Sequence, residues 1–292
     1  MDEIFFQQII NGIALGSSYA LVAVGFSLMF GILRAANLAH GEVAMVGTFV
    51  CLTAARLGLP FPAALATGAI AAGVASLAIE RICFLPYRKH DYVIPVLSTI
   101  GMSIFLQSIA IQLWGSDATL YKVGFPSVRY EIGPIGFTSV HIMIVVTTVV
   151  LMFALTYLVY RTKVGRGIRA IAENVEIARA IGIKPGPLIV LVFIISGPIA
   201  GIAGILVGLN NTAVSPFFGL EMTFKGMVAM FLGGMTNMYG AVLAGLLIGL
   251  VEVLMVGYFS ANYRDGVVYA LFILALLIRP QGLLGTVATR RV

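Results

Sequence analysis

Long apolar runs dominate the pattern of hydrophobic and polar positions along this chain. Most runs approach the roughly 20 residues that a helix needs to cross a bilayer. The candidate spans are 5–30, 43–57, 62–80, 93–113, 137–160, 188–209, 238–259 and 265–279. A further segment, 222–235, is rich in Met and Gly, carries Lys225 and is short, which favours a broken or re-entrant element. The pattern predicts an all-α, polytopic integral membrane protein with about eight or nine transmembrane helices.

Composition agrees with a membrane protein. Of the 292 residues 60% are hydrophobic and 10% are charged, and the mean hydropathy is +1.04. An average soluble domain is about half apolar and about a quarter charged. These values exclude a soluble enzyme and a disordered chain, and Cys51 and Cys83 are too few for a disulfide scaffold. The first apolar run has no basic residues before it, so we expect a first span and not a cleaved signal.

The basic residues predict the orientation. With the N-terminus outside, the loops predicted to be cytoplasmic hold Arg34, Arg81, Arg88, Lys89, Arg161, Lys163, Arg166, Arg169, Arg179, Lys184, Arg279, Arg290 and Arg291. The opposite loops hold only Arg56, Lys122, Arg129 and Arg264. This bias follows the positive-inside rule and places the C-terminus inside if 222–235 counts as a crossing. Because the net charge of +6 lies in short loops, it does not indicate a nucleic-acid binder.

Two segments between the spans exceed a turn. The outer one, 114–136, predicts an interfacial loop with aromatic anchors such as Trp114, Tyr121 and Tyr130. The inner one, 161–187, predicts a helix from Gly165 to Gly182, because its apolar residues recur at helical spacing. That helix either lies on the membrane surface or docks in a groove of a cytoplasmic partner. Docking is favoured because no other predicted cytoplasmic element is large enough to receive a mechanical input.

Sequence motifs for catalysis are absent. The chain has no GxxxxGK[ST] phosphate loop, HExxH, CxxC or GxSxG motif. His40, His90 and His141 show no metal-ligand spacing. We therefore expect no enzyme activity, no catalytic residues, no metal and no cofactor in this chain.

Polar residues within apolar segments are the candidate functional groups, since each ionisable group costs roughly 2.5–3.5 kcal/mol to insert. Three groups qualify as residues of a translocation pathway: Asn37, His40 and Glu42 after the first span, Glu252 within a span, and Lys225 with Asn237 around the short Gly-rich element. The alternatives are an ordinary turn with a capped helix for the first group, and a pair with a neighbouring helix for Glu252. GxxxG pairs predict close helix packing.

A short internal match suggests an inverted repeat. Residues 40–47 (HGEVAMVG) and 225–232 (KGMVAMFL) share four of eight positions. The preceding spans, 5–30 and 188–209, run in opposite directions in the predicted topology. Inverted repeats line the pathway of many transporters, although four matches also arise by chance in a chain this apolar.

Five segments carry a family resemblance: NGIALGSSYALVAVGFSLMFGILRAANLAHGE (11–42), STIGMSIFLQS (98–108), GRGIRAIAENVEIARAIGI (165–183), FLGGMTNMYGAVLAG (231–245) and IRPQGLLG (278–285). In this order, over nearly the whole chain, they closely resemble permease subunits of bacterial ATP-binding cassette (ABC) importers for branched-chain amino acids, of the LivH type. The residues from Asn37 to Glu42 match the family's N-F/L-A-H-G-E signature, with Leu38 at the variable position.

The resemblance implies one transmembrane permease domain, 1–292, with a cytoplasmic coupling-helix insertion at 161–187. Its motif for contact with the ATPase is matched by Glu176, Ala178 and Gly182, while Ile177 replaces the expected middle Ala. The candidate ATPase-coupling residues are Arg169, Glu173, Asn174, Glu176, Ala178, Arg179 and Gly182.

The resemblance also implies partners in the bacterial inner membrane. These are a second, related permease, two cytoplasmic ATPase subunits that bind and hydrolyse ATP, and a periplasmic substrate-binding protein. The implied cargo is a branched-chain amino acid, translocated by alternating access, whereas related permeases carry urea or short-chain amides. A self-sufficient channel or secondary carrier is a further alternative, favoured only by the internal match.

Overall fold

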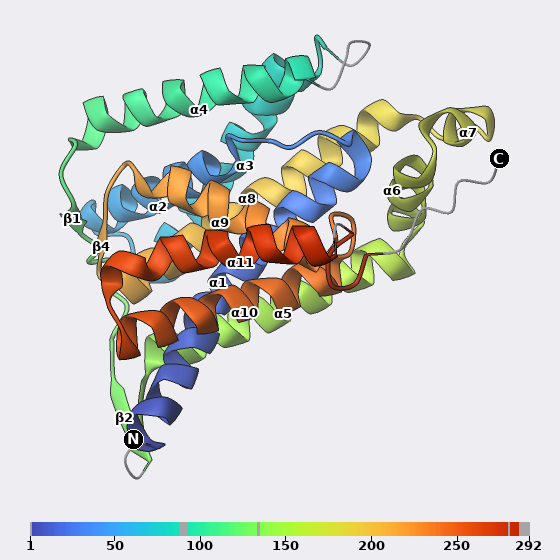
Figure 1. Cartoon of the computed structure of the whole chain (residues 1–292). Coiled ribbons are helices and arrows are strands. Elements are labelled where there is room, and N and C mark those ends of the chain that lie inside the picture. Colours follow the sequence, from blue (N-terminus) through green and yellow to red (C-terminus); the bar gives the residue numbers. More distant parts are fainter. Residues whose placement is uncertain (1, 88–92, 133–134, 280, 286–292) are drawn as a thin grey trace.

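The computed structural model describes residues 2–87, 93–132, 135–279 and 281–285, and it is an all-α, polytopic membrane protein (Figure 1). The helices that form the candidate membrane spans are α1 (Asp2–Leu33), α3 (Phe61–Ile79), α4 (Val93–Trp114), α5 (Ser139–Arg161), α8 (Pro185–Asn211), α10 (Met238–Tyr258) and α11 (Arg264–Ile278). The other helices are α2 (His40–Arg56), α6 (Lys163–Glu173), α7 (Val175–Ala180) and α9 (Phe218–Gly233). A π-helical turn (Glu80–Phe84) extends α3, and a 3-10 turn (Ala261–Tyr263) precedes α11.

The described residues include seven helices long and apolar enough to cross a membrane: α1, α3 with its π-helical extension, α4, α5, α8, α10 and α11 with its preceding turn. The predicted spans 43–57 and 222–235 correspond to α2 and α9, which have 17 and 16 residues. At 1.5 Å per residue, 16 residues reach about 24 Å, less than the ~30 Å hydrocarbon core. Length alone therefore does not confirm eight or nine crossings.

The two short helices begin inside the bundle and meet at their N-terminal ends. The Gly41 backbone N–H donates to Thr223 Oγ1 (3.0 Å), and a Cβ at Gly219 would lie 3.1 Å from the Gly41 carbonyl oxygen. His40, the first residue of α2, packs against Gly25 of α1. Gly25 lies eight residues, or about 12 Å, before the end of α1 at Leu33. The chain therefore re-enters the bundle through residues 34–39 before α2 starts.

The internal match aligns the first turn of α2 with the middle of α9, because His40 begins α2 whereas Lys225 is the eighth residue of α9. In that alignment the N-terminal end of α2 would not superpose on the N-terminal end of α9, although these two ends meet inside the bundle. The inverted repeat stays a prediction.

Small residues let α1 lie close to α10, as the GxxxG pattern predicted. A Cβ at Gly16 would lie 2.7 Å from Leu246 Cα, and one at Gly245 would lie 2.6 Å from the Ala20 backbone. Both neighbours are backbone atoms, so no rotamer change would make room. α1 and α8 carry much of the buried core, while α4, α5 and α11 expose apolar side chains outward.

The segment predicted as an interfacial loop is partly structured. Strands β2 (Arg129–Ile132) and β3 (Ile135–Thr138) form an antiparallel hairpin, and β1 (Thr119–Leu120) pairs with β4 (Ala213–Val214). Tyr121 is buried and its hydroxyl donates to the Thr48 carbonyl (3.3 Å), while Trp114 Nε1 donates to Thr53 Oγ1 (2.9 Å). These two aromatic residues therefore anchor the loop to protein and not to the membrane interface.

The predicted single helix from Gly165 to Gly182 is wrong, because α6 and α7 are separate helices with Asn174 between them. Asn174 has an extended backbone (φ −156°, ψ 114°), and its Oδ1 accepts the N–H groups of Glu176 and Ile177 (2.9 and 3.0 Å). Asn is a preferred N-cap because its short side chain replaces the missing backbone partners. Gly182, with φ +86°, ends α7 in the left-handed conformation that Gly adopts without strain.

Figure 1 shows two ends of the bundle. The N-terminal end carries the start of α1, the β2–β3 hairpin and the turn from α10 to α11. The α6–α7 end lies opposite. Of the residues used to predict orientation, Arg88, Lys89, Arg290 and Arg291 lie outside the described part of the chain.

Candidate functional site

Lys225 lies at the centre of a buried group of charges. Its Nζ is 2.6 Å from Glu221 Oε1, 2.9 Å from Glu252 Oε1 and 3.2 Å from Asp265 Oδ1. The Lys225 side chain is 0% exposed and that of Glu252 is 1% exposed. A buried charge is stable only when it is paired and hydrogen-bonded, and the three carboxylates meet this need.

Arg264 joins the same carboxylates from the more exposed side. It lies 2.9 Å from Glu221 Oε1, 3.3 Å from Glu252 Oε1 and 3.5 Å from Asp265 Oδ1. The Arg264 and Glu221 side chains are each 37% exposed. We call Glu221, Lys225, Glu252, Arg264 and Asp265 the five-charge cluster. Its two basic and three acidic side chains give a formal charge of −1.

Three helices bring the cluster together. Glu221 and Lys225 are four residues apart on α9, so they face the same side. Glu252 comes from the last two turns of α10, and Arg264 and Asp265 begin α11. The tight turn between α10 and α11 is held by Ser260, whose side chain caps the 3-10 turn. A short connection between antiparallel helices therefore places residues 252 and 264 side by side.

Tyr19 adds a neutral group from α1. Its hydroxyl donates to Glu252 Oε1 (3.2 Å) and accepts from Lys225 Nζ (3.1 Å). Oxygen atoms of Glu221, Glu252 and Asp265 lie close enough together to suggest a cation site. The Lys225 ammonium already contacts all three carboxylates, and it takes the place that a metal ion would occupy.

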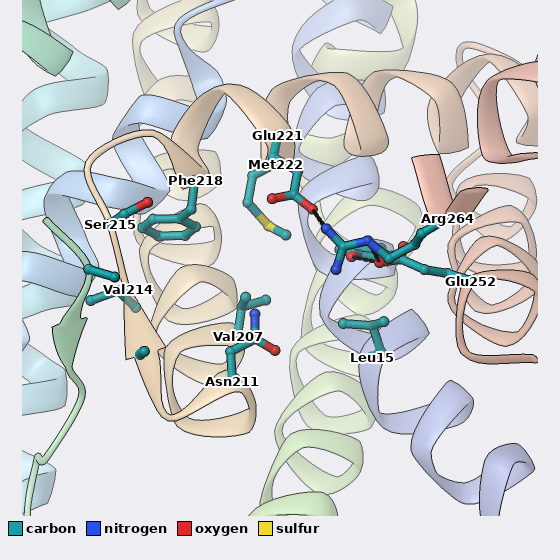
Figure 2. Close-up of a pocket in the computed structure, with 13 residues that line it drawn as sticks. Leu15, Val207, Asn211, Val214, Ser215, Phe218, Glu221, Met222, Glu252 and Arg264 are labelled. Carbon is teal, nitrogen blue, oxygen red and sulfur yellow. Dashed lines mark hydrogen bonds and ion pairs between the residues drawn. The ribbon is translucent and has the colours of Figure 1, made fainter. Parts of the chain in front are cut away.

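Two cavities open beside the cluster, toward the N-terminal end. Cavity I has a volume of about 230 Å³, and cavity II has about 390 Å³. Leu15, Glu252 and Arg264 line both cavities. Figure 2 shows cavity I, where the Glu221–Arg264 pair lies on one side and Val207, Val214 and Phe218 contribute apolar surface. The arrangement can receive a molecule that carries both charged and apolar parts.

Two carboxylate oxygens of the cluster lack a hydrogen-bond partner among the described residues: Asp265 Oδ1, which has ion-pair contacts only, and Glu252 Oε2. Glu252 Oε1 contacts Tyr19, Lys225 and Arg264, while no described residue donates to the buried Oε2. An ionised carboxylate normally accepts several hydrogen bonds. Glu252 therefore retains acceptor capacity beside both cavities.

Asn37, His40 and Glu42 form a separate group at the start of α2. Asn37 Oδ1 accepts the Ala39 backbone N–H (3.2 Å), which agrees with the alternative of an ordinary turn. His40 packs edge-on against Phe26 at 4.7 Å, and neither ring nitrogen has a partner among the described residues. Glu42 is fully buried and accepts from Ser103 Oγ (3.2 Å).

Thr223 connects this group to the five-charge cluster. Its hydroxyl accepts from the Gly41 N–H and lies 3.3 Å from the Leu38 carbonyl. Thr223 is two residues before Lys225 on α9. The residues between α1 and α2 therefore contact the helix that holds the central ammonium.

Asn237 lies apart from both groups. Its side chain caps α10 through the Tyr239 and Gly240 N–H groups, and it donates to the Leu284 carbonyl (2.9 Å). Fifteen residues of α10, or about 22 Å, separate it from Glu252. The structure gives Asn237 a capping role and does not bring it to the cavities.

The predicted coupling residues lie on α6 and α7, with Gly182 just beyond. Glu173, Glu176 and Arg179 are exposed, whereas Ala178 is buried. Ile177 and Ile181 lie one turn apart and are 62% and 69% exposed, which leaves an apolar stripe beside the charges. Arg169 is directed to its own chain, since it donates to the Val159 carbonyl (2.6 Å) and its guanidinium lies over the Tyr160 ring (5.2 Å).

Arg34 ties the coupling helices to the re-entering chain. Its guanidinium donates to the carbonyls of Ala172 and Glu173 at the end of α6 (2.9 and 3.2 Å). Free carbonyls at a helix C-terminus attract a cation. Arg34 also has φ +52°, a value uncommon outside Gly and Asn.

Comparison with known proteins assigns the chain to a family. The family model described as "Branched-chain amino acid transport system / permease component" matches residues 8–276. The chain belongs to this family.

Two relatives of this permease family match nearly end to end. The high-affinity branched-chain amino acid transport system permease protein BraD of Pseudomonas aeruginosa is 35% identical over 300 residues, which cover 98% of each chain. The corresponding permease protein LivH of Escherichia coli K12 is 36% identical over 298 residues, which cover 96% of each chain. A second permease protein of that organism, LivM, is 32% identical over 126 residues, or 42% of this chain and 29% of LivM. All three are named as transport proteins, in keeping with the expectation that the chain is not an enzyme.

Sequence reasoning selected two of the five charges in this permease's cluster. Lys225 and Glu252 stood out as charges within apolar segments, whereas Arg264 was counted among loop residues and Asp265 was not singled out. Glu221 offered a signal, because its spacing of four from Lys225 is that of a helical ion pair. Tyr19, Thr223 and Arg34 gave no signal, since their partners are more than 100 residues away.

Proposed function

We propose that the chain is a transmembrane permease subunit of an ABC importer that carries leucine, isoleucine and valine across the inner membrane. The observation that carries this proposal is the near end-to-end similarity to BraD and LivH. The whole chain, 1–292, acts as one transmembrane domain with residues 161–187 as its cytoplasmic insertion. The N-terminus is periplasmic and the C-terminus is cytoplasmic, as the basic residues predict.

The partners follow from the same similarity and from the lack of a phosphate loop in the sequence. ATP is bound and hydrolysed by two cytoplasmic ATPase subunits, and a periplasmic binding protein delivers the amino acid. A second permease related to this chain completes the membrane part. LivH and LivM, two permease proteins of one organism that both match this chain, support a heteromeric pair.

The translocation pathway starts at the cavities beside the five-charge cluster, which the predicted orientation places toward the periplasm. Lys225 and Glu252 lie at its wall, and the buried group Asn37, His40 and Glu42 lies deeper, where α2 and α9 meet. Tyr19, which lines cavity I, and Lys225 are both buried. Their movement would open the pathway during alternating access.

ATPase motion enters through α7 and reaches the pathway through two contacts. The docking face of α7 consists of four exposed residues: Glu176, Ile177, Arg179 and Ile181. It binds the ATPase as a helix binds in a groove. Arg34 then links the end of α6 to residues 34–39. The Gly41 contact with Thr223 continues the connection to α9.

Reconstitution tests the proposal. The permease pair and both ATPases are placed in proteoliposomes with the binding protein, and uptake of leucine, urea and acetamide is measured. We expect leucine uptake that requires ATP and the binding protein. Uptake of urea or acetamide in place of leucine would assign the alternative cargo, and flux through this chain alone would indicate a channel or carrier.

The coupling face has its own test in the same system. Glu176→Lys and Arg179→Glu reverse charges on α7 without touching the cavities. We expect ATP hydrolysis to continue while leucine uptake per ATP falls. Normal coupling in both variants would reject the docking role.

A further inference from the structure

The five-charge cluster has spare acceptor capacity at Glu252, a residue that lines both cavities. Its formal charge is −1, and Glu252 Oε2 has no donor within the part of the chain that the structure describes. The Glu252 side chain is 1% exposed, so bulk water does not readily supply one. A buried carboxylate with spare acceptor capacity favours a ligand that brings N–H donors and positive charge.

We propose that cavity I is a binding site for the zwitterionic head and aliphatic side chain of a free α-amino acid. This assignment rests on the proposed function, and it adds the location at which the permease itself binds the amino acid. The ammonium group binds Glu252 Oε2 and Glu221, and the carboxylate binds the Arg264 guanidinium. The side chain lies against Leu15, Val207 and the other apolar residues of the cavity.

The Arg264–Glu221 ion pair can be exchanged for two ion pairs with a zwitterionic ligand. The two side chains are 37% exposed and are joined to each other at 2.9 Å. A zwitterion inserted between them replaces one ion pair by two and adds no net charge. An arginine fork also matches a carboxylate in a bidentate geometry. A molecule without charged groups, such as urea, would leave the Arg264–Glu221 pair unchanged and Glu252 Oε2 without a charged donor.

Lys225 serves as the fixed part of the site. Its ammonium is completely buried and contacts three carboxylates, so a ligand in cavity I does not reach it without displacing Tyr19 or Glu221. Lys225 thereby holds the Glu252 carboxylate in place, while the more exposed Arg264 guanidinium lines cavity I. Cation binding is disfavoured, because Lys225 already holds the position between the carboxylate oxygens.

The cavity walls fit an aliphatic side chain. Besides the charged residues and Tyr19, cavity I is lined by Leu15, Ala118, Val207, Asn211, Ala213, Val214, Ser215, Phe218 and Met222. Most of these side chains are apolar, and the polar ones are few. Cavity II, which shares Leu15, Glu252 and Arg264, also contains Gln8, Asn11 and Asn210 and offers a polar approach from the N-terminal end.

Equilibrium binding tests the site directly. Radiolabelled leucine is titrated onto the purified permease–ATPase complex in nanodiscs, without ATP and without the binding protein. We expect saturable binding that weakens about tenfold or more in Glu221→Gln and in Arg264→Lys. Glu131→Gln is the matched control, because Glu131 forms an exposed pair with Arg129 on β2, outside both cavities, and its binding should equal that of the unmodified complex.

Two leucine analogues separate the roles of the charges. 4-Methylpentanoate lacks the ammonium group and 3-methylbutylamine lacks the carboxylate, and each competes with labelled leucine. In Glu221→Gln we expect a smaller preference for leucine over 4-methylpentanoate, because the partner of the ammonium group is lost. In Arg264→Lys we expect a smaller preference for leucine over 3-methylbutylamine, because the partner of the carboxylate is altered. A variant that only loosened the fold would weaken all three ligands alike, which would contradict the assigned roles.

The outcomes distinguish this site from the proposed function. If the unmodified complex imports leucine but shows no saturable binding up to millimolar leucine, or if both variants bind leucine like the control, the site is wrong and the function stands. If the unmodified complex imports no branched-chain amino acid, the function is wrong. Thermal unfolding of each purified complex checks that each variant is folded.

Discussion

Lys225 Nζ lies 2.9 Å from Glu252 Oε1, in a salt bridge whose two side chains are almost completely buried. The bridge joins α9, a helix too short to cross the membrane by itself, to α10, which is long enough to do so. Glu221 and Asp265 contact the same ammonium, so the pair belongs to a network and not to an isolated bridge.

Removal of the ammonium should destabilise the protein strongly. Lys225→Met leaves the buried Glu252 with only Arg264, which is 37% exposed, as a cation, and loss of one partner of a buried ion pair costs about 3–5 kcal/mol. Lys225→Met combined with Glu252→Gln should recover part of this loss, because the carboxylate that lost its buried partner is neutralised as well. Reversible unfolding of the detergent-solubilised single and double variants measures the coupling. Strictly additive losses would show that the two side chains do not interact.

Loss of the Arg34 guanidinium should uncouple ATP hydrolysis from transport. Arg34→Ala removes both donors to the end of α6, while Arg34→Asn also removes them but tolerates the positive φ better. We expect both variants to hydrolyse more ATP per leucine imported, with only about 1 kcal/mol or less lost in stability. The ratio of phosphate released to leucine imported measures this. An unchanged ratio in both would remove Arg34 from the coupling route.

The bend between α6 and α7 should depend on the Asn174 cap. Asn174→Ala removes the acceptor for two backbone N–H groups at a cost of about 1 kcal/mol, and favours one continuous helix. Asn174→Asp keeps the acceptor and is the matched control. Spin labels on cysteines at 166 and 180 report the distance between the helices. We expect a changed distance distribution only in Asn174→Ala, and equal distributions would contradict the role of the cap.

Close packing of α1 on α10 should reject a side chain at Gly16. Gly16→Val would place its Cβ 2.7 Å from Leu246 Cα, and overpacking of this kind costs about 1–3 kcal/mol or more. Gly101→Ala on α4 is the control, because no atom lies within 4 Å of its added Cβ and Ala favours the helix by about 0.5–1 kcal/mol. Melting temperatures in detergent should fall for Gly16→Val and stay or rise for Gly101→Ala. The reverse order would show that the helices are not this close.

Thiol labelling checks the orientation. Cysteines introduced at Lys122, which is exposed near the N-terminal end, and at Val175 on α7 should react with a membrane-impermeant reagent from opposite sides. Cys51 and Cys83 are buried, so the background should be low. Labelling of both positions from the same side would overturn the predicted topology.

Much of the architecture follows from local properties of the sequence. The predicted spans lie within a few residues of the observed helices, since an apolar run of about 20 residues satisfies its own backbone hydrogen bonds only as a helix. The segment 222–235 stands out for a different reason: it is short, rich in Met and Gly and carries Lys225. The break at Asn174 was missed, because the surrounding residues are good helix formers and the cap outweighs them at a single position.

The candidate site could be predicted only in part. A charged residue in an apolar segment implies that the folded protein supplies a partner, but the sequence does not show which residue that is. Lys225 and Glu252 are therefore both predicted site residues, but the sequence does not pair them with each other. In the structure Asn37 accepts a backbone N–H within a turn, and Asn237 caps α10. A polar residue near a helix end has the same sequence pattern whether it serves local structure or function, so the sequence does not distinguish the two roles.

The sequence by itself determined that this is a polytopic helical membrane protein of the branched-chain permease family, because hydrophobic length and ordered motifs are properties of the chain. Only the tertiary structure decided which charges meet. Tyr19 contacts Glu252 across 233 positions in the sequence, and Gly41 contacts Thr223 across 182. Such contacts depend on how α1, α2, α9 and α10 pack, and packing is set by small residues and buried polar pairs together, which no single segment encodes.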